Sequence, residues 1–158
     1  TVTDTRTIDN DKSGGILVNK FKEANHNLIE RKICKDNKDD IVVILREWLK
    51  NEKIDVIITT GGTGLTGRDI TPEALNEVAE KHIPGFGEIF RNISIKTVGT
   101  SAIQSRACAV LSNGKYIFAL PGSSGGVTDA WEGILKHQLD INHKPCNFVE
   151  LFPRLKEK

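Results

Sequence analysis

Residues 54–74 read IDVIITTGGTGLTGRDITPEA and combine a buried strand, a glycine-rich loop and the start of a helix. Ile54–Thr60 is rich in β-branched residues and carries no charge after its second position, which is typical of a central parallel strand covered by helices on both faces. Thr71-Pro72-Glu73 supplies an N-cap, a proline in the first helical turn and an acid near the helix N-terminus. A helix from Thr71 to His82 is expected, and the strand–loop–helix order predicts an α/β fold.

Strand and helix signals alternate on both sides of this stretch. Apolar residues at helical spacing predict helices over residues 13–24, 36–51 and 86–93. Asn27–Cys34 is expected to form a strand, and Thr1-Val2-Thr3 has the character of the end of a strand. Short links between alternating elements favour a doubly wound, mostly parallel sheet.

One pair of strands departs from this parallel pattern. Ala107–Ser112 and Tyr116–Leu120 are strand-like and are joined by Asn113-Gly114, the dipeptide that most strongly predicts a two-residue hairpin turn. An antiparallel hairpin at the edge of a mostly parallel sheet accommodates them. The expected fold is therefore a three-layer, doubly wound α/β sheet with an antiparallel edge hairpin, in one domain covering residues 1–158.

Composition and charge narrow the classes of partner. The chain has 158 residues, 27% of them charged, and a net charge of +1, so nothing electrostatic favours nucleic acid or an acidic membrane surface. Its apolar runs are too short to span a bilayer. The three cysteines and four histidines are scattered without metal-ligand spacing, which argues against a zinc site or a disulfide framework and favours the cytoplasm.

Two glycine-rich loops each follow a strand and precede a helix: Gly61–Gly64 and Pro121–Gly126. In open α/β sheets, ligands bind at the carboxyl ends of the strands, where backbone amides and helix N-termini attract anions. Gly61–Gly64 alone is more typical of a tight turn than of a binding loop, because short motifs match often by chance. The neighbouring Arg68-Asp69 reverses this balance by placing a cation and a carboxylate beside the glycines.

The two acidic candidates each leave alternatives open. Asp69 suits a Mg²⁺ ligand that shares the ion with substrate phosphates, but it could equally pair with Arg68 or cap the following helix. Asp36 follows the expected second strand and would lie in the same layer of loops. Local sequence favours a plain N-cap for Asp36 over a second acidic member of the site.

Several motifs together resemble the molybdenum cofactor biosynthesis family MoaB/MogA, which includes molybdopterin adenylyltransferases and gephyrin G domains. The motifs, in chain order, are VTDTR (2–6), DKSG (11–14), GGTG (61–64), RDITPEA (68–74), PGFGE (84–88), SR (105–106) and LPGS (120–123). They span nearly the whole chain. The segment KPCNF (144–148) is similar to the protein B branch, some of whose members lack one or both catalytic acids. A related CinA-type domain fits less well, because that group differs at residues 68–72.

The resemblance implies a function and a site. It implies binding of molybdopterin and its adenylylation by ATP with Mg²⁺, in a homotrimer or homohexamer. Asp36 and Asp69 fall on the catalytic, Mg²⁺-binding aspartates. The expected contacts to pterin, nucleotide or phosphate are Ser13, Gly61, Gly62, Thr63, Gly64, Arg68, Ser105, Pro121, Gly122 and Ser123. The alternative is a non-catalytic molybdopterin-binding protein or an oligomeric scaffold.

Overall fold

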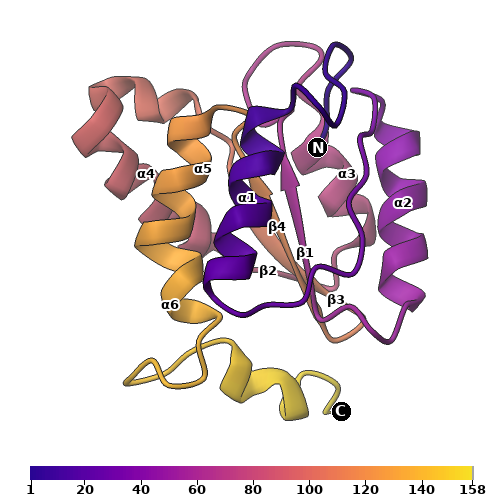
Figure 1. Ribbon diagram of the computed structural model, residues 1–158, viewed down its shortest axis with the longest axis vertical. Helices are drawn as coiled ribbons and strands as arrows, with labels where there is room; N and C mark the ends of the chain where they lie inside the picture. Colours follow the sequence, from indigo (N-terminus) through magenta and orange to yellow (C-terminus); the bar gives the residue numbers. More distant parts are fainter. Residues whose placement is uncertain (158) are drawn as a thin grey trace.

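A mixed sheet forms the centre of the molecule (Figure 1). The computed structural model describes residues 1–157, so Lys158 of the expected 1–158 domain lies outside the described residues. The strands occur in the spatial order β1-β4-β3-β2. Their bounds are β1 Val56–Thr60, β2 Lys81–His82, β3 Cys108–Ser112 and β4 Lys115–Leu120.

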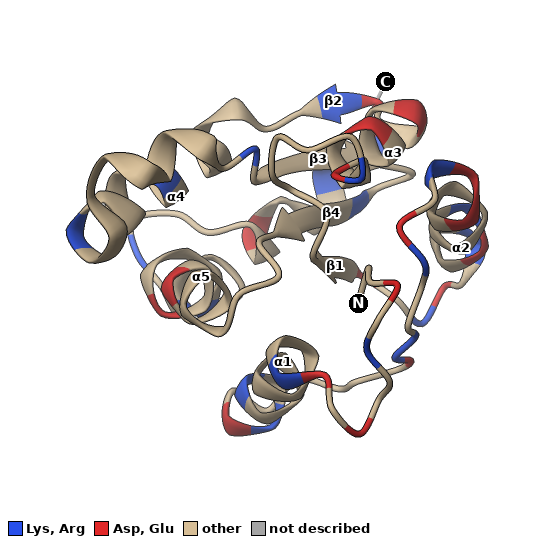
Figure 2. Cartoon of the chain, turned by 90° about the horizontal axis from the view of Figure 1, so that it is seen from above, with Lys and Arg blue, Asp and Glu red and all other residues tan. Residues whose placement is uncertain are grey.

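Helices cover both faces of the sheet and make the expected three-layer α/β architecture (Figure 2). The longer helices are α1 Lys12–Glu23, α2 Lys38–Lys50, α3 Thr71–Val78, α4 Pro84–Val98 and α5 Ser124–Ala130. A π-helical turn, Trp131–Leu135, links α5 to α6, Lys136–Gln138, and two 3₁₀ helices span Gly99–Gln104 and Val149–Arg154. Helices α1, α4 and α5 lie on one face, and α2 and α3 lie on the other.

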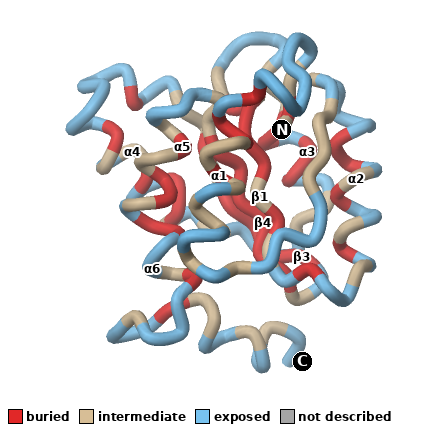
Figure 3. The backbone as a smooth tube through the Cα atoms, viewed as in Figure 1, coloured by how far each residue is buried: buried red, intermediate tan, exposed pale blue. Residues whose placement is uncertain are grey.

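Strand β4 shows why the sheet residues are almost continuously apolar. Tyr116, Phe118 and Leu120 pack into the core under α1, α4 and α5, whereas Ile117 and Ala119 pack under α2 and α3. Every residue of β4 is buried, as the burial view in Figure 3 shows for the centre of the sheet. A strand with helices on both faces has no solvent side, so apolar residues fill it. The exception is Lys115 at its start, whose Nζ donates to Asn51 O (2.8 Å).

The predicted hairpin is confirmed, and its position in the sheet is a finding. Strands β3 and β4 are antiparallel, and Asn113 and Gly114 adopt φ values of 48° and 70°, as a two-residue hairpin turn requires. The hairpin lies inside the sheet, because β4 pairs parallel with β1 and β3 pairs antiparallel with β2. Strand β1, expected at the centre, is the terminal strand of this ladder.

Two boundaries predicted from the sequence are wrong. The third helix ends at Val78, and Lys81–His82 pairs with β3, because the Glu80 N–H donates to Leu111 O (2.9 Å) and the Ile83 N–H donates to Ala109 O (2.8 Å). Asn27–Cys34 forms no strand apart from one parallel bridge between Cys34 and Val2. A distant backbone partner is present for residues 80–83 and is lacking for most of Asn27–Cys34. The presence or lack of that partner, rather than local sequence, determines the structure of each segment.

Helix α4 is longer than the expected 86–93 and continues to Val98, where Gly99 ends it with φ of 60°. Phe86 and Phe90 anchor it in the core. No helix within residues 1–157 is long and apolar enough to cross a membrane.

Candidate functional site

The carboxyl ends of three extended segments meet at one edge of the sheet. Thr60 and Leu120 are register partners at the ends of β1 and β4, so the two glycine-rich loops that follow lie side by side. The Gly61 N–H donates to Leu120 O (3.0 Å), and the Thr60 hydroxyl donates to Pro121 O (2.8 Å). The Val2 N–H donates to Thr60 O (2.9 Å), which brings the segment after Val2 to the same edge.

An open pocket of about 610 Å³ lies at this edge. All twelve site residues expected from the sequence line it: Ser13, Asp36, Gly61, Gly62, Thr63, Gly64, Arg68, Asp69, Ser105, Pro121, Gly122 and Ser123. Thr5, Arg6, Ser101 and Gln104 also line it but were not among the expected contacts, although Thr5 and Arg6 belong to the motif VTDTR. Ser101 and Gln104 come from the 3₁₀ helix 99–104, for which the sequence carries no local signal. Residues from six separate segments therefore share one concave surface.

The first glycine loop is fixed by its own backbone and by helix α3. Gly61 and Gly62 have φ values of 107° and 65°, and a methyl group on Gly61 would overlap the carbonyl oxygen of Val2. Thr71 was expected to cap α3, but the preceding Ile70 is the N-cap residue. The Thr71 hydroxyl instead donates to Gly61 O (2.8 Å), and its N–H donates to Gly62 O (3.0 Å). The start of α3 thus holds the loop in its conformation.

Asp69 is held at the pocket by the loop itself. Its Oδ2 accepts hydrogen bonds from the Thr66 N–H (2.8 Å) and the Thr66 hydroxyl (2.7 Å). Partial burial opposes ionisation of Asp69, but the hydrogen bonds from Thr66 outweigh it and lower its pKa. Arg68 pairs with Asp4 rather than with Asp69. The alternative interpretations of Asp69, as an Arg68 partner or as the cap of α3, are therefore wrong.

Asp36 is not the helix cap that its local sequence favours. Asn37 caps α2, since its side-chain oxygen accepts the Asp40 N–H (3.1 Å). The Asp36 N–H donates to Asp4 Oδ1 (3.1 Å), and its carboxylate faces the glycine loop, 3.5 Å from the position that a Cβ on Gly62 would take. Burial, and then the negative charge of Asp69, raise the pKa of Asp36. The negative charge of Asp69 therefore acts on Asp36 across the glycine loop.

Arg106 clamps the loop that carries Asp69, a role that Ser105-Arg106 alone could not indicate. Its Nε donates to Gly64 O (2.7 Å), its Nη2 donates to Asp69 O, and its guanidinium pairs with Glu73 of α3. The Arg106 N–H also donates to Thr63 O (2.8 Å). One planar side chain thereby ties both ends of the loop to the helix that follows it.

Arg106→Ala is expected to lower the free energy of unfolding by about 1–3 kcal/mol, because it leaves loop carbonyls and Glu73 without their donor. Urea unfolding at pH 7 measures this change. The matched control is Arg46→Ala, which also breaks a pair with a glutamate, Glu77, but on an exposed helix surface. We expect about 0–1 kcal/mol for the control. Equal losses in the two variants would contradict a clamping role for Arg106.

Ser13 is positioned by a buried carboxylate at the start of α1. Asp11 caps this helix by accepting the Gly14 N–H (3.0 Å), and it also accepts the Ser13 hydroxyl (3.1 Å) and Arg31 Nη2 (3.0 Å). Burial opposes ionisation, but hydrogen bonds from Thr1, Gly14, Arg31 and Ser13 together lower the pKa of Asp11 from 3.8 to about 2. The charged form of Asp11 therefore stabilises the folded state.

Asp11→Asn is expected to cost about 2 kcal/mol of unfolding free energy at pH 7, because folding lowers the pKa of Asp11 from 3.8 to about 2. Because folding lowers the pKa of Asp11, its ionised carboxylate stabilises the folded state at pH values above the unfolded pKa of 3.8. This contribution is lost as the pH falls toward 2. Urea unfolding at pH 7, 4 and 2 should therefore show the gap between wild type and variant closing with acid. Asp9→Asn, at an exposed position, serves as the control. A gap that stays constant with pH would contradict the assignment.

Comparisons with known proteins agree with the geometry. Residues 2–141 match the family model described as a probable molybdopterin binding domain. The chain is 41% identical over 157 residues to molybdenum cofactor biosynthesis protein B of Escherichia coli strain K12, covering 99% of this chain and 91% of that protein. It is similar to a crystal structure of a molybdenum cofactor biosynthesis protein B, with a TM-score of 0.88, 37% identity and coverage of 99% and 92%. The crystal structure of the tungsten cofactor synthesizing protein MoaB from Pyrococcus furiosus is also similar, with a TM-score of 0.78 and 34% identity. That match covers 87% of this chain and 88% of the other.

Proposed function

Since the chain belongs to the molybdenum cofactor biosynthesis protein B family, we propose that its pocket binds molybdopterin and adenylylates it with Mg-ATP, releasing pyrophosphate. The observation that carries the proposal is the convergence of all twelve expected residues on one pocket of about 610 Å³. Such a volume suits a small organic ligand. The walls supply hydroxyls, loop amides and arginines of the kind that bind phosphate groups.

The donor set fits Mg²⁺ that is shared with substrate. Asp36 and Asp69 would hold the ion from opposite sides of the glycine loop. Within residues 1–157, no group of three or more His, Cys, Asp or Glu side chains could bind a metal alone. Mg²⁺ commonly uses one or two carboxylates together with phosphate oxygens and water, so two aspartates suffice once a nucleotide is present. The bound ion would neutralise negative charge on the phosphates.

The transfer itself needs positioning and charge neutralisation more than covalent help. An oxygen of the terminal phosphate of molybdopterin attacks the α-phosphorus of ATP and forms a new phosphorus–oxygen bond. The bond between the α-phosphorus and the oxygen that bridges it to the β-phosphorus breaks. Pyrophosphate leaves with that oxygen. The attacking phosphate is already an anion, so no strong general base is required. Gly61–Gly64 would orient one phosphate group, and Arg68 would offset charge on another.

The direct test mixes purified protein, molybdopterin, ATP and Mg²⁺ and follows pyrophosphate release. We expect pyrophosphate and adenylylated molybdopterin in equal amounts, with no release when either substrate is omitted or when Mg²⁺ is chelated. Tight molybdopterin binding without any pyrophosphate would reject the enzyme and leave the non-catalytic binding protein. If the protein neither bound molybdopterin nor released pyrophosphate, the assignment of this pocket as the functional site would be rejected.

A scaffold role in a homotrimer or homohexamer is the second candidate. Helix α4 and the adjoining 3₁₀ helix expose Ile89, Ile95, Val98 and Ile103, four large apolar side chains that self-association would cover. Sedimentation velocity at micromolar concentration tests this candidate independently of catalysis. A monomer would exclude it.

A further inference from the structure

A second arginine in the wall of the functional pocket has no assigned role in the proposed transfer. Two cationic side chains, Arg6 and Arg68, are among the lining residues, and Arg68 already pairs with Asp4. Arg6 belongs to the segment 3–11, which runs from beside β1 to the start of α1 (Figure 2). Its side chain is 41% exposed. The partners of its guanidinium therefore decide whether Arg6 holds the fold together or is available to a ligand.

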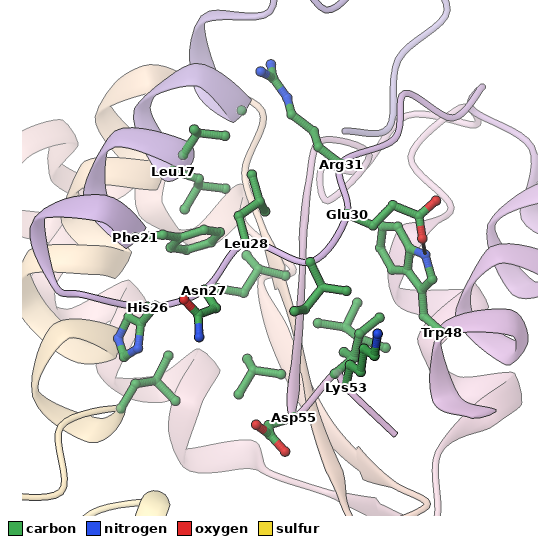
Figure 4. Close-up of a pocket in the computed structure, with 18 of the residues that line it drawn as sticks. Leu17, Phe21, His26, Asn27, Leu28, Glu30, Arg31, Trp48, Lys53 and Asp55 are labelled. Atoms are coloured by element: carbon green, nitrogen blue, oxygen red, sulfur yellow. Dashed lines mark hydrogen bonds between the residues drawn. The ribbon is translucent and has the colours of Figure 1, made fainter. Parts of the chain in front are cut away.

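Asp11 does not account for the position of Arg6. The distance from Arg6 Nη1 to Asp11 Oδ1 is 3.9 Å, which is longer than a charge-assisted hydrogen bond. Asp11 already accepts from four closer donors: the Thr1 hydroxyl, the Ser13 hydroxyl, the Gly14 N–H and Arg31 Nη2. Arg31 comes from the segment that lines a separate cavity of about 440 Å³, and its side chain points toward the start of α1 (Figure 4). Arg31 therefore neutralises Asp11, and the positive charge of Arg6 remains available.

The guanidinium of Arg6 is held at one nitrogen only. Its Nη1 donates to Gly122 O at 3.4 Å, which is a long hydrogen bond. Within residues 1–157, the Nε and Nη2 atoms of Arg6 donate to no acceptor. These two nitrogens form an edge that can bind two oxygens of one phosphate group at the same time. The contact with Gly122 thus orients Arg6 and leaves a bidentate edge free.

The second glycine loop provides further donors beside Arg6. Gly122 packs against the first glycine loop, since a Cβ on Gly122 would lie 3.2 Å from Gly61 Cα. Ser123 Oγ accepts the Gly126 N–H (3.1 Å), so its hydroxyl hydrogen is free to donate to a ligand. The backbone N–H groups of Gly122 and Ser123 also lack an acceptor in the described part of the chain. Arg6 therefore lies where the two glycine loops meet, beside donors that no group of residues 1–157 uses.

This group of donors suits a phosphate monoester on a small organic molecule. We propose that Arg6, together with the hydroxyl of Ser123, binds the terminal phosphate of molybdopterin, the group that attacks ATP; this inference rests on the proposed function. A phosphate monoester presents negative charge and three strong acceptor oxygens. The free edge of Arg6 matches two of these oxygens, and the Ser123 hydroxyl can donate to the third.

The charges of the pocket assign Arg6 to the attacking phosphate rather than to the nucleotide. Asp36 and Asp69 lie beside the first glycine loop, where their negative charges favour a phosphate only when Mg²⁺ is shared with it, as in Mg-ATP. In an in-line transfer, the attacking and leaving oxygens lie on opposite sides of the α-phosphorus. Arg6 is held against the second glycine loop and supplies a positive charge there without a metal. It therefore suits the phosphate that approaches without Mg²⁺.

Inorganic phosphate tests this subsite without turnover. It is titrated into the protein in the absence of Mg²⁺, and the backbone amide signals of Gly122 and Ser123 are followed by NMR. We expect saturable shifts in the wild type and a dissociation constant about 10–100-fold higher in Arg6→Gln, because hydrogen bonds to charged groups contribute this much. Arg6→Lys keeps the charge but not the planar edge and should give an intermediate value. Arg154→Gln removes an arginine that is 70% exposed outside the pocket lining and should match the wild type.

Measurements with the pterin separate phosphate binding from a general structural role of Arg6. We expect Arg6→Gln to raise the KM for molybdopterin by about tenfold or more and the KM for Mg-ATP by less than about threefold. Molybdopterin from which the phosphate has been removed should bind to the wild type and to Arg6→Gln with equal affinity in calorimetric titration. A disturbed loop would instead weaken the binding of both forms of the pterin.

Two results would overturn the role of Arg6. The first is equal phosphate affinity in the wild type and Arg6→Gln, and the second is an equal loss of affinity for molybdopterin with and without its phosphate. The proposed function can fail separately. A protein that binds molybdopterin but releases no pyrophosphate would reject catalysis, whereas the phosphate titration would still decide the role of Arg6.

Discussion

Asp69→Asn is expected to slow pyrophosphate release from Mg-ATP and molybdopterin by about 10²–10³-fold, the loss typical of removing one preorganised charge from a transferring phosphate. The substitution keeps the shape of the side chain and an oxygen that can accept from Thr66. It removes one of the two negative charges available to Mg²⁺. Molybdopterin affinity should change by only a few-fold, because the remaining pocket wall is intact. Pyrophosphate assays and calorimetric titration of the pterin separate the two effects.

Two controls distinguish charge from loop structure. Thr66→Val removes the hydroxyl that bonds Asp69 but leaves the carboxylate, so we expect a loss of about tenfold or less. Asp39→Asn neutralises an exposed aspartate in the first turn of α2, away from the pocket lining, and should leave the rate unchanged. Asp69→Asn with wild-type turnover would show that the carboxylate takes no part in the transfer.

Local sequence predicted the elements whose structure depends on nearby residues. Asn113-Gly114 determines its hairpin because both residues must adopt positive φ, which few other dipeptides tolerate. Helices α1 and α2 start where their capping side chains, Asp11 and Asn37, accept amide protons from the first turn. The strand–loop–helix order indicated that the glycine loops lie at one edge of the sheet, whereas the full set of pocket residues was expected from the family resemblance.

Features that depend on distant backbone could not be predicted in this way. Residues 80–83 leave helical conformation because β3 offers an unpaired edge, and that edge exists only after the hairpin has formed. Asn27–Cys34 has strand composition, yet a strand requires a neighbour, and only Cys34 has one. The burial of β1 on both faces made it resemble a central strand, and its free edge is visible only in the sheet.

The side chains that hold the pocket loops together, Arg106 and Asp4, could not be predicted from local sequence either. Arg106 and Asp4 each join segments more than 30 residues apart, through Gly64 and Asp69 in one case and through Arg68 and Asp36 in the other. No spacing rule links such residues. The sequence therefore indicated which residues surround the pocket but not which side chains hold them there.

Gly61→Ala is expected to lower the free energy of unfolding by about 2–4 kcal/mol, since it combines an unfavourable backbone angle with a steric clash. Gly61 has φ of 107°, and its Cβ would overlap the carbonyl oxygen of Val2, which is backbone and cannot rotate away. Relief would require breaking the hydrogen bond from the Val2 N–H to Thr60 O and displacing Val2 from its bridge position beside Cys34. Thermal unfolding should show a fall in Tm of about 5–10 °C for a chain of this length.

Gly15→Ala is the matched control for this loss, because it is the same substitution at a glycine inside helix α1 whose Cβ would meet no atom within 4 Å. Alanine favours helix over glycine by up to about 1 kcal/mol, so the control should raise Tm slightly. The same glycine-to-alanine substitution is therefore expected to lower Tm at position 61 and to raise it at position 15. If Gly61→Ala were as stable as wild type, the tight approach of the glycine loop to Val2 would be wrong, and with it the packing of the pocket wall against β1.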